Sequence, residues 1–246
     1  MRLDIIGSAG SYPAPDSACS SYLLQSGKTS LLLDVGNGAQ ARLYRRIEPS
    51  DLDAIVVSHG HLDHFADLVG LYHYLKFASP PKSPIPVFTN DETIDRLHCV
   101  LGSTIDPKVF SLTRVGPGSL VTIRNVEIRF HEANHPVATL ITRVSDGRSA
   151  MCYGADGDLC QNLSVASQNA DLLLGESTWT ERAEGFPPGL HLDAMGLASL
   201  AETSHVGQLV VTHIAYPANK EKILAIVKAG YSGIANLAEE GRTFWC

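Results

Sequence analysis

The chain is organised around the stretch Ala54-Ile55-Val56-Val57-Ser58-His59-Gly60-His61-Leu62-Asp63-His64. The apolar run at its start is typical of a buried strand, and four side chains that can bind a metal ion follow it closely. Apolar residues then recur at helical spacing from Phe65 to Leu75, so Asp63 and His64 should lie where a helix begins. The pattern predicts a metal site at the carboxyl end of a strand.

The order of these side chains favours two adjacent metals over one tetrahedral ion. His59 and His61 should share one side of an extended turn, whereas Asp63 and His64 are directed to the other side. An ordinary buried or surface role would explain two histidines near a carboxylate. It does not explain three histidines and an aspartate at this spacing.

Composition and charge limit the class of protein. With 246 residues and 44% hydrophobic content, the chain can bury a large core, and we expect one domain spanning residues 1–246. A formal net charge of −7 argues against a basic surface for long nucleic acids. Residues 1–7 do not resemble a signal region, and no run of eighteen apolar residues occurs, so we expect a cytoplasmic protein without a membrane segment. The scattered cysteines indicate neither a disulfide framework nor a thiolate metal site.

Strand and helix patterns alternate in the first half of the chain and give way to strands in the second. Strands are expected at residues 3–6, 20–24, 30–34, 54–57 and 86–88, and helices at 39–47, 65–75 and 91–101. A further run of strands at 109–112, 120–123, 126–130 and 139–144 is expected to form a second sheet. Since each sheet must bury one face, the sequence predicts an α/β (α+β) protein built as a four-layer αββα sandwich.

Three more potential ligands lie at strand ends. His135 follows the strand around Phe130, Asp156 follows the apolar residues 150–153, and His213 ends the apolar run 209–212. Singly, each could be a capping aspartate or a surface histidine. Together they repeat the geometry of the first motif, in which a rigid strand places a ligand at the rim of a sheet.

The motif His59-x-His61-x-Asp63-His64 resembles the signature of the metallo-β-lactamase-fold hydrolases, and the resemblance extends over nearly the whole chain. It implies two divalent metal ions, Zn²⁺ or alternatively Mn²⁺. By this resemblance, His59, His61 and His135 hold one metal, while Asp63, His64 and His213 hold the other. Asp156 would bridge them, with Asp158 as the competing bridge; we prefer Asp156 because Asp158 should cap the next helix. Asp34 is expected to orient the ligands through hydrogen bonds.

The segment Glu176-Ser177-Thr178 and the later His191 resemble the Glu-x-Thr segment and late histidine of the ribonuclease Z-like branch. The resemblance implies that Glu176 holds the His191 tautomer and that His191 donates a proton to the leaving oxygen. These two residues and Asp63 are the expected catalytic residues. Alternatively, His191 is merely a neighbour of the N-cap of a helix at 194–204.

Two departures from the tRNA-processing members point to a smaller substrate. Only twenty residues separate His135 from Asp156, where those members carry a long arm, and His213 is not followed by their Ser-x-Arg stretch. The resemblance then implies a phosphodiesterase acting on a small phosphodiester such as a cyclic nucleotide. A tRNA 3′-end endonuclease, a thioester or lactam hydrolase and a non-catalytic metal-stabilised scaffold are the alternatives, and a homodimer is left open. The Gly-rich and Ser-rich loop at 7–17 is either a phosphate cradle or an ordinary exposed loop.

Overall fold

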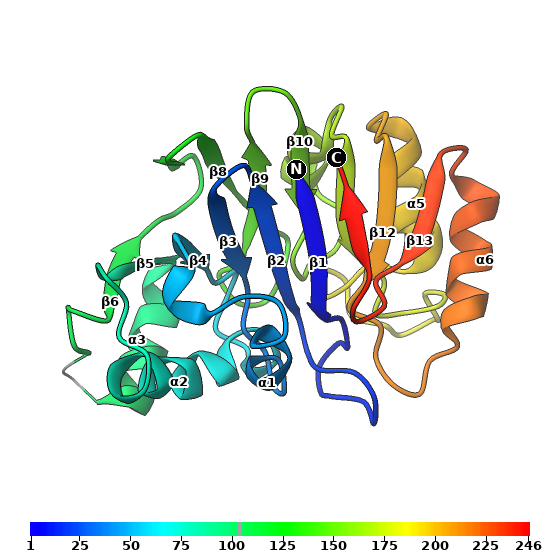
Figure 1. Cartoon of the computed structure of the whole chain (residues 1–246). Coiled ribbons are helices and arrows are strands. Elements are labelled where there is room, and N and C mark those ends of the chain that lie inside the picture. Colours follow the sequence, from blue (N-terminus) through cyan, green and yellow to red (C-terminus); the bar gives the residue numbers. More distant parts are fainter. Residues whose placement is uncertain (103–104) are drawn as a thin grey trace.

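The computed structural model describes residues 1–102 and 105–246 as two mixed β-sheets packed face to face, with helices on both outer surfaces (Figure 1). The first sheet contains, in spatial order, β14 (Thr243–Trp245), β1 (Arg2–Gly7), β2 (Ser21–Ser26), β3 (Thr29–Leu33), β4 (Ala54–Val56), β5 (Ile85–Thr89) and β6 (Phe110–Arg114). The second contains β13 (Ile234–Leu237), β12 (Gln208–Thr212), β11 (Leu172–Glu176), β10 (Ala150–Tyr153), β9 (Leu140–Ser145), β8 (Val126–Glu132) and β7 (Leu120–Ile123). The expected αββα sandwich is confirmed.

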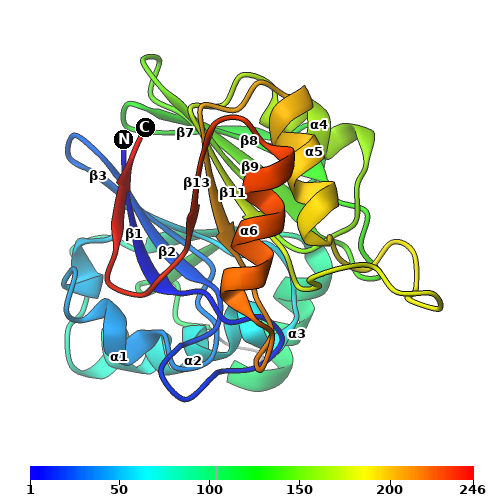
Figure 2. The same cartoon turned by 90° about the vertical axis from the view of Figure 1, so that its right-hand side faces the viewer.

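The helices divide between the two outer faces (Figure 2). The first sheet is covered by α1 (Gln40–Leu43), α2 (Leu62–Phe77) and α3 (Asp91–Leu101), and the second by α4 (Gln161–Ser167), α5 (Ala194–Thr203) and α6 (Lys220–Gly230). The helix expected at 91–101 is found with those bounds, because the Asn90 side chain accepts a hydrogen bond from the Thr93 amide and caps its start.

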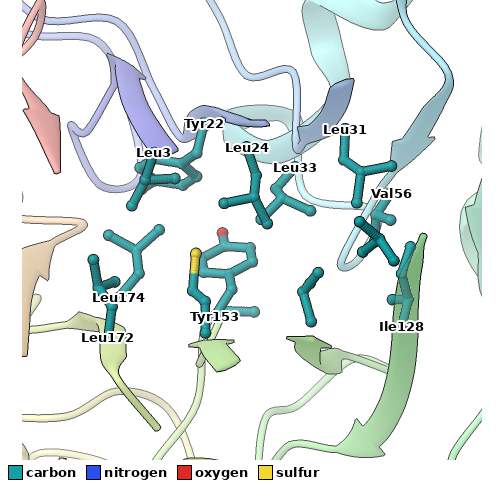
Figure 3. Close-up of a cluster of buried hydrophobic side chains, with 14 of the residues drawn as sticks. Leu3, Tyr22, Leu24, Leu31, Leu33, Val56, Ile128, Tyr153, Leu172 and Leu174 are labelled. Carbon is teal, nitrogen blue, oxygen red and sulfur yellow. The ribbon is translucent and has the colours of Figure 1, made fainter. Parts of the chain in front are cut away.

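The main core lies between the sheets, and it follows from the alternation of side chains along each strand. Leu31 and Leu33 of β3 point inward toward the second sheet, which contributes Tyr153 and Ile128 on this side of the core (Figure 3), whereas Leu32 between them packs outward under the helices. Truncating one of these fully buried leucines to alanine should cost about 2–5 kcal/mol of stability.

Two expectations about the elements are wrong. The strand expected at 109–112 in the second sheet is β6, which instead pairs parallel to β5 at the edge of the first sheet, with Ile85 opposite Phe110. The crossover through α3 returns the chain to the same sheet, which a strand pattern alone does not reveal. The helix expected at 39–47 is only the short α1; tighter turns follow it before the 3₁₀ helix Pro49–Asp51. Proline cannot continue the helix, and the chain must turn there to enter β4.

Within the described residues, no helix is both long and apolar enough to cross a membrane. All five cysteines are free.

Candidate metal centre

The ligand candidates converge because the strands that precede them end at the same rim of the sandwich. His59 and His61 follow β4, Asp63 and His64 occupy the first turn of α2, and Asp156 and His213 follow β10 and β12. The structure brings these side chains together in two groups whose potential ligand atoms lie within 4.8 Å of one another: His59, His61, His135 and Asp156 in one, and Asp63, His64, Asp156 and His213 in the other. Asp156 is common to both groups.

The first group is a cluster of facing imidazoles. His59 Nε2 lies 3.0 Å from His61 Nδ1, and His135 Nε2 lies 3.4 Å from the same His61 nitrogen. Burial lowers the pKa of His59 well below its usual value and also lowers the pKa values of His61 and His135. These rings are therefore neutral near pH 7, which is the form that binds metals.

The second group combines imidazoles with carboxylates. His213 Nε2 lies 3.1 Å from Asp63 Oδ2 and 3.3 Å from His64 Nε2. Burial opposes charge on both rings, but the neighbouring carboxylates, Asp156 foremost, raise the pKa of His64 well above its usual value and that of His213 to about 9. Against the cost of burial, the imidazoles lower the pKa values of Asp63 and Asp156. A metal bound at this group must displace protons.

Hydrogen bonds from the outer ring nitrogens aim the histidines at the centre. The Nδ1 atom of His64 donates to Asp34 Oδ2 (2.7 Å), that of His135 to the Leu190 carbonyl oxygen (2.8 Å), and that of His213 to Thr178 Oγ1 (2.9 Å). When the ring is neutral, each bond fixes the tautomer that leaves Nε2 unprotonated and directed at the centre, which is the usual arrangement for metal-binding histidines.

Asp34 makes the hydrogen bonds expected of an orienting residue. Its buried carboxylate accepts bonds from the Ser58 amide (2.7 Å), the Ser58 hydroxyl (2.8 Å) and the Tyr153 hydroxyl (2.6 Å), besides the bond from His64. Ser58 and Tyr153 were not singled out from the sequence. Only their proximity to ligand candidates in the sequence could have indicated their role: Ser58 directly precedes His59, and Tyr153 ends the strand before Asp156.

The donor set fits divalent metal ions. Asp156 Oδ1 is buried without a hydrogen-bond partner among the described residues, although His64 Nε2 lies 3.2 Å away and His213 Nε2 3.3 Å away. An unsatisfied carboxylate oxygen facing imidazole nitrogens is costly unless a further group occupies the centre. Nitrogen and oxygen donors of this kind suit Zn²⁺ and related divalent ions.

Asp158 belongs to neither group of ligand candidates. Its Oδ1 accepts a hydrogen bond from Arg182 Nη2 (2.6 Å), and its Oδ2 accepts one from the Gly189 amide (3.0 Å). The expectation that it caps the following helix is wrong, because Cys160 is the N-cap of α4. The short turn after β10 directs Asp156 to the centre and Asp158 to the neighbouring loop.

Glu176 and His191 lie beside both groups. His191 Nδ1 donates to Glu176 Oε1 (2.9 Å), and the His191 ring centroid lies 5.4 Å from that of His135 and 5.5 Å from that of His213. His191 also lies two residues before Asp193, the N-cap of α5, as the alternative expected, and its side chain is bonded to Glu176. Thr178 completes the network by donating to Glu176 Oε2 (2.6 Å). Its signal in the sequence was the Glu-x-Thr spacing.

The loop at 7–17 supports the ligand candidates with its backbone. The Ser11 amide donates to Asp63 Oδ2 (2.7 Å). Gly10 packs so closely on His213 that a Cβ there would lie 2.6 Å from the His213 carbonyl oxygen. This part of the loop is therefore built against the centre, and only glycine fits at position 10.

Known proteins share these features. A family model described as the metallo-beta-lactamase superfamily matches residues 14–93, which include the His59–His64 motif. The chain is 28% identical to the probable metallo-hydrolase YhfI of Bacillus subtilis (strain 168), over 98% of both chains. It is 24% identical to a ribonuclease Z of Methanosarcina mazei, over 87% of each.

Solved structures of other proteins have the same fold as this chain. The crystal structure of YhfI superposes with a TM-score of 0.90 over 99% of this chain and 98% of that one. A diphosphatase of the PhnP family, 18% identical, shares the fold with a TM-score of 0.80 over 100% of this chain and 97% of that one. Motif, fold and family model together show that this chain contains a metallo-beta-lactamase superfamily domain, and over its whole length it is similar to the probable metallo-hydrolase YhfI.

Proposed function

We propose that this protein is a metal-dependent phosphodiesterase that hydrolyses a small phosphodiester such as a cyclic nucleotide. The observation that carries the proposal is the Glu176–His191 hydrogen bond of 2.9 Å next to two groups of metal-ligand candidates that share Asp156. A phosphodiester with an alkoxide leaving group needs this combination, because a poor leaving group must be protonated as it departs.

The proposed ligands follow the two groups. His59, His61 and His135 hold one divalent ion, Asp63, His64 and His213 hold the second, and Asp156 bridges them. Zn²⁺ is the proposed metal, with Mn²⁺ as the alternative. A bound pair of such ions supplies an activated water and stabilises the charge that develops on the phosphoryl oxygens.

The protein residues supply orientation and the proton. Glu176 accepts a hydrogen bond from Nδ1–H of His191, so Nε2 is the atom that donates a proton to the leaving oxygen. The buried Glu176 carboxylate is held by the Gly157 amide (2.8 Å) and by Thr178, which keeps the acceptor fixed. Asp63 is held by the Ser11 amide and stays in the orientation that a metal ligand requires.

The short connection between His135 and Asp156 and the negative net charge both favour a small substrate. The residues between His135 and Asp156 are largely taken up by β9, β10 and the turn between them, which leaves no length for an RNA-binding arm. The net charge of −7 gives no general attraction for a polyanion. A tRNA 3′-end endonuclease is the second candidate, because the ribonuclease Z of Methanosarcina mazei is a relative over most of the chain.

A substrate panel tests the proposal. The metal-loaded protein is assayed with a 3′,5′-cyclic nucleotide, bis-(p-nitrophenyl) phosphate, precursor tRNA and a thioester, each at low and high salt, with Asp156→Ala as the control for contaminating activity. We expect cleavage of the first two, lost in the control. Efficient tRNA cleavage with a steep loss on adding salt would favour the endonuclease. Thioester cleavage alone would favour the other hydrolase class, and no turnover of any substrate would favour a metal-stabilised scaffold.

A further inference from the structure

The segment between β11 and α5 carries aromatic and charged residues that have no role in the proposed hydrolysis. Figure 2 shows this segment, in yellow, projecting from the body of the molecule. It contains Trp179, Arg182 and Phe186, and His191, the proposed proton donor, lies near its end. Its aromatic and charged residues lie beside the proposed leaving-group side of the site.

Two aromatic rings of this segment contact each other next to His191. The ring centroids of Trp179 and Phe186 lie 4.5 Å apart at an interplanar angle of 45°. Trp179 also meets the His191 ring edge to face, with centroids 5.7 Å apart and an angle of 87°. Neither aromatic residue belongs to the hydrophobic clusters formed by the described residues, and Phe186 is 39% exposed. Core packing therefore does not account for the pair.

Asp158 and Arg182 hold this segment in place. Arg182 Nη2 donates to Asp158 Oδ1 (2.6 Å) and to the His191 carbonyl oxygen (3.1 Å), while the Gly189 amide donates to Asp158 Oδ2 (3.0 Å). The Arg182 guanidinium also lies 5.8 Å from the centroid of the Trp179 ring. Arg182 and Gly189, on either side of Phe186, are thus tied to one carboxylate, and the Trp179 amide donates to the Leu192 carbonyl oxygen, so the aromatic pair is held before a ligand arrives. Such preorganisation reduces the entropy lost on binding.

We propose that Trp179 and Phe186 form a stacking subsite for a nucleobase, and that the substrate is therefore a phosphodiester of a nucleoside. This inference rests on the proposed function, since it takes the substrate to be a phosphodiester whose leaving oxygen faces His191. The group attached to that oxygen extends past His191, where the aromatic pair lies. Every nucleobase, whichever of the four it is, has a flat π-face that can stack on such rings. An aliphatic group has no π-face and cannot stack on them.

Substrates with and without a base test the subsite. Adenosine 3′,5′-cyclic phosphate is compared with the analogue in which a methoxy group replaces the adenine. In Phe186→Ala, kcat/KM for the adenosine substrate should fall roughly tenfold, which corresponds to about 1.4 kcal/mol, while that for the base-free analogue changes less than about twofold. Phe186→Tyr should restore the loss, because its ring also stacks. The matched control is Phe77→Ala, which removes a 74% exposed ring at the carboxyl end of α2 and should change neither value.

Tryptophan fluorescence tests the same subsite without turnover. The chain has two tryptophans, so Trp245→Phe leaves Trp179 as the reporter. Adenosine 5′-monophosphate should quench its emission and ribose 5-phosphate should not. Equal losses on both cyclic substrates in Phe186→Ala, with no selective quenching, would reject the subsite and leave the phosphodiesterase proposal standing. Selective quenching in a metal-loaded protein that cleaves neither substrate would reject the phosphodiesterase proposal and keep the subsite.

Discussion

The carboxylate of Asp34 lies 2.7 Å from Nδ1 of His64, and both side chains are fully buried. The same carboxylate holds the Ser58 amide, next to His59, and the Tyr153 hydroxyl, near Asp156. One residue at the end of β3 therefore links the motif loop, the start of α2 and the end of β10. Because these contacts orient three ligand candidates, Asp34 should influence metal binding without touching a metal.

We expect Asp34→Asn to weaken metal binding roughly 10- to 100-fold, the usual effect of removing an orienting partner. The carboxylate accepts hydrogen bonds from His64, from the surrounding hydroxyl groups and from the Ser58 amide with two oxygens. The asparagine amide has only one accepting oxygen. Titration with a competing chelator measures the affinity. Tyr153→Phe is the control, since it removes one hydrogen bond to Asp34 but leaves the His64 contact, and it should have a smaller effect. Unchanged affinity in Asp34→Asn would show that His64 needs no orienting carboxylate.

Metal analysis should find a pair of ions in the metal-saturated protein, within about 4 Å of each other as in other dinuclear hydrolases. Asp156→Ala should lose the pair together with activity, because that carboxylate belongs to both groups. Asp158→Ala should keep the metal content, since Asp158 bonds to Arg182 and Gly189 instead. Elemental analysis with one ion per saturated chain, or a retained pair in Asp156→Ala, contradicts this assignment.

We expect His191→Ala to retain its metals and to lower turnover of phosphodiesters with poor leaving groups by roughly a hundredfold, the usual scale of general acid catalysis. A p-nitrophenolate leaving group needs little protonation, so its release should fall much less. Steady-state kinetics on both kinds of substrate measure the difference. If both fall equally, His191 positions the substrate and does not donate the proton.

Arg182→Met should reduce turnover while changing stability by less than about 1 kcal/mol. The Arg182 side chain is 38% exposed, so solvent weakens its ion pair and can replace it at the largely buried Asp158 carboxylate, which keeps its hydrogen bond from the Gly189 amide. Its bond to the His191 carbonyl oxygen, however, positions the proposed acid. On substrates without a nucleobase, the loss should therefore be larger for poor leaving groups, and it should disappear when Arg182→Met is made in a His191→Ala background. Additive losses in the double variant would show that Arg182 acts independently of His191.

The metal-free protein should lose stability as the pH rises from about 6.5 to 9. Burial disfavours the charged form of His213, but Asp156 and Asp63 overcome this cost and raise its pKa to about 9, against 6.5 for an unperturbed histidine. The folded chain therefore holds a proton that the unfolded chain has released, so the stabilisation is complete below about pH 6.5 and is lost as the pH rises through 9.

Urea unfolding of chelator-treated protein at several pH values measures this dependence, with a slope of at most about 1.4 kcal/mol per pH unit for each retained proton. His213→Asn should reduce the slope, leaving the contribution of His64, whose pKa is raised in the same direction. A free energy of unfolding that stays constant over this range would show that the imidazoles are neutral without metal.

The sequence by itself determined the αββα architecture and the convergence of the ligand candidates. His59, Asp156 and His213 each follow an apolar run, and an apolar run of that length is a strand whose carboxyl end reaches the rim of its sheet. The helix at Asp91–Leu101 was predictable for a similar local reason, namely an amphipathic pattern that starts at a capping residue.

Only the tertiary structure decided the relations that depend on distant partners. The sheet that β6 joins is set by the crossover through α3, and the separate roles of Asp156 and Asp158 are set by the turn after β10 and by Arg182, 24 residues further along the chain. Likewise, Trp179 and Phe186 are ordinary loop residues in the sequence, and only folding places them against His191. Local patterns specify periodicity and strand ends, whereas pairing between remote segments depends on the packing of the whole chain.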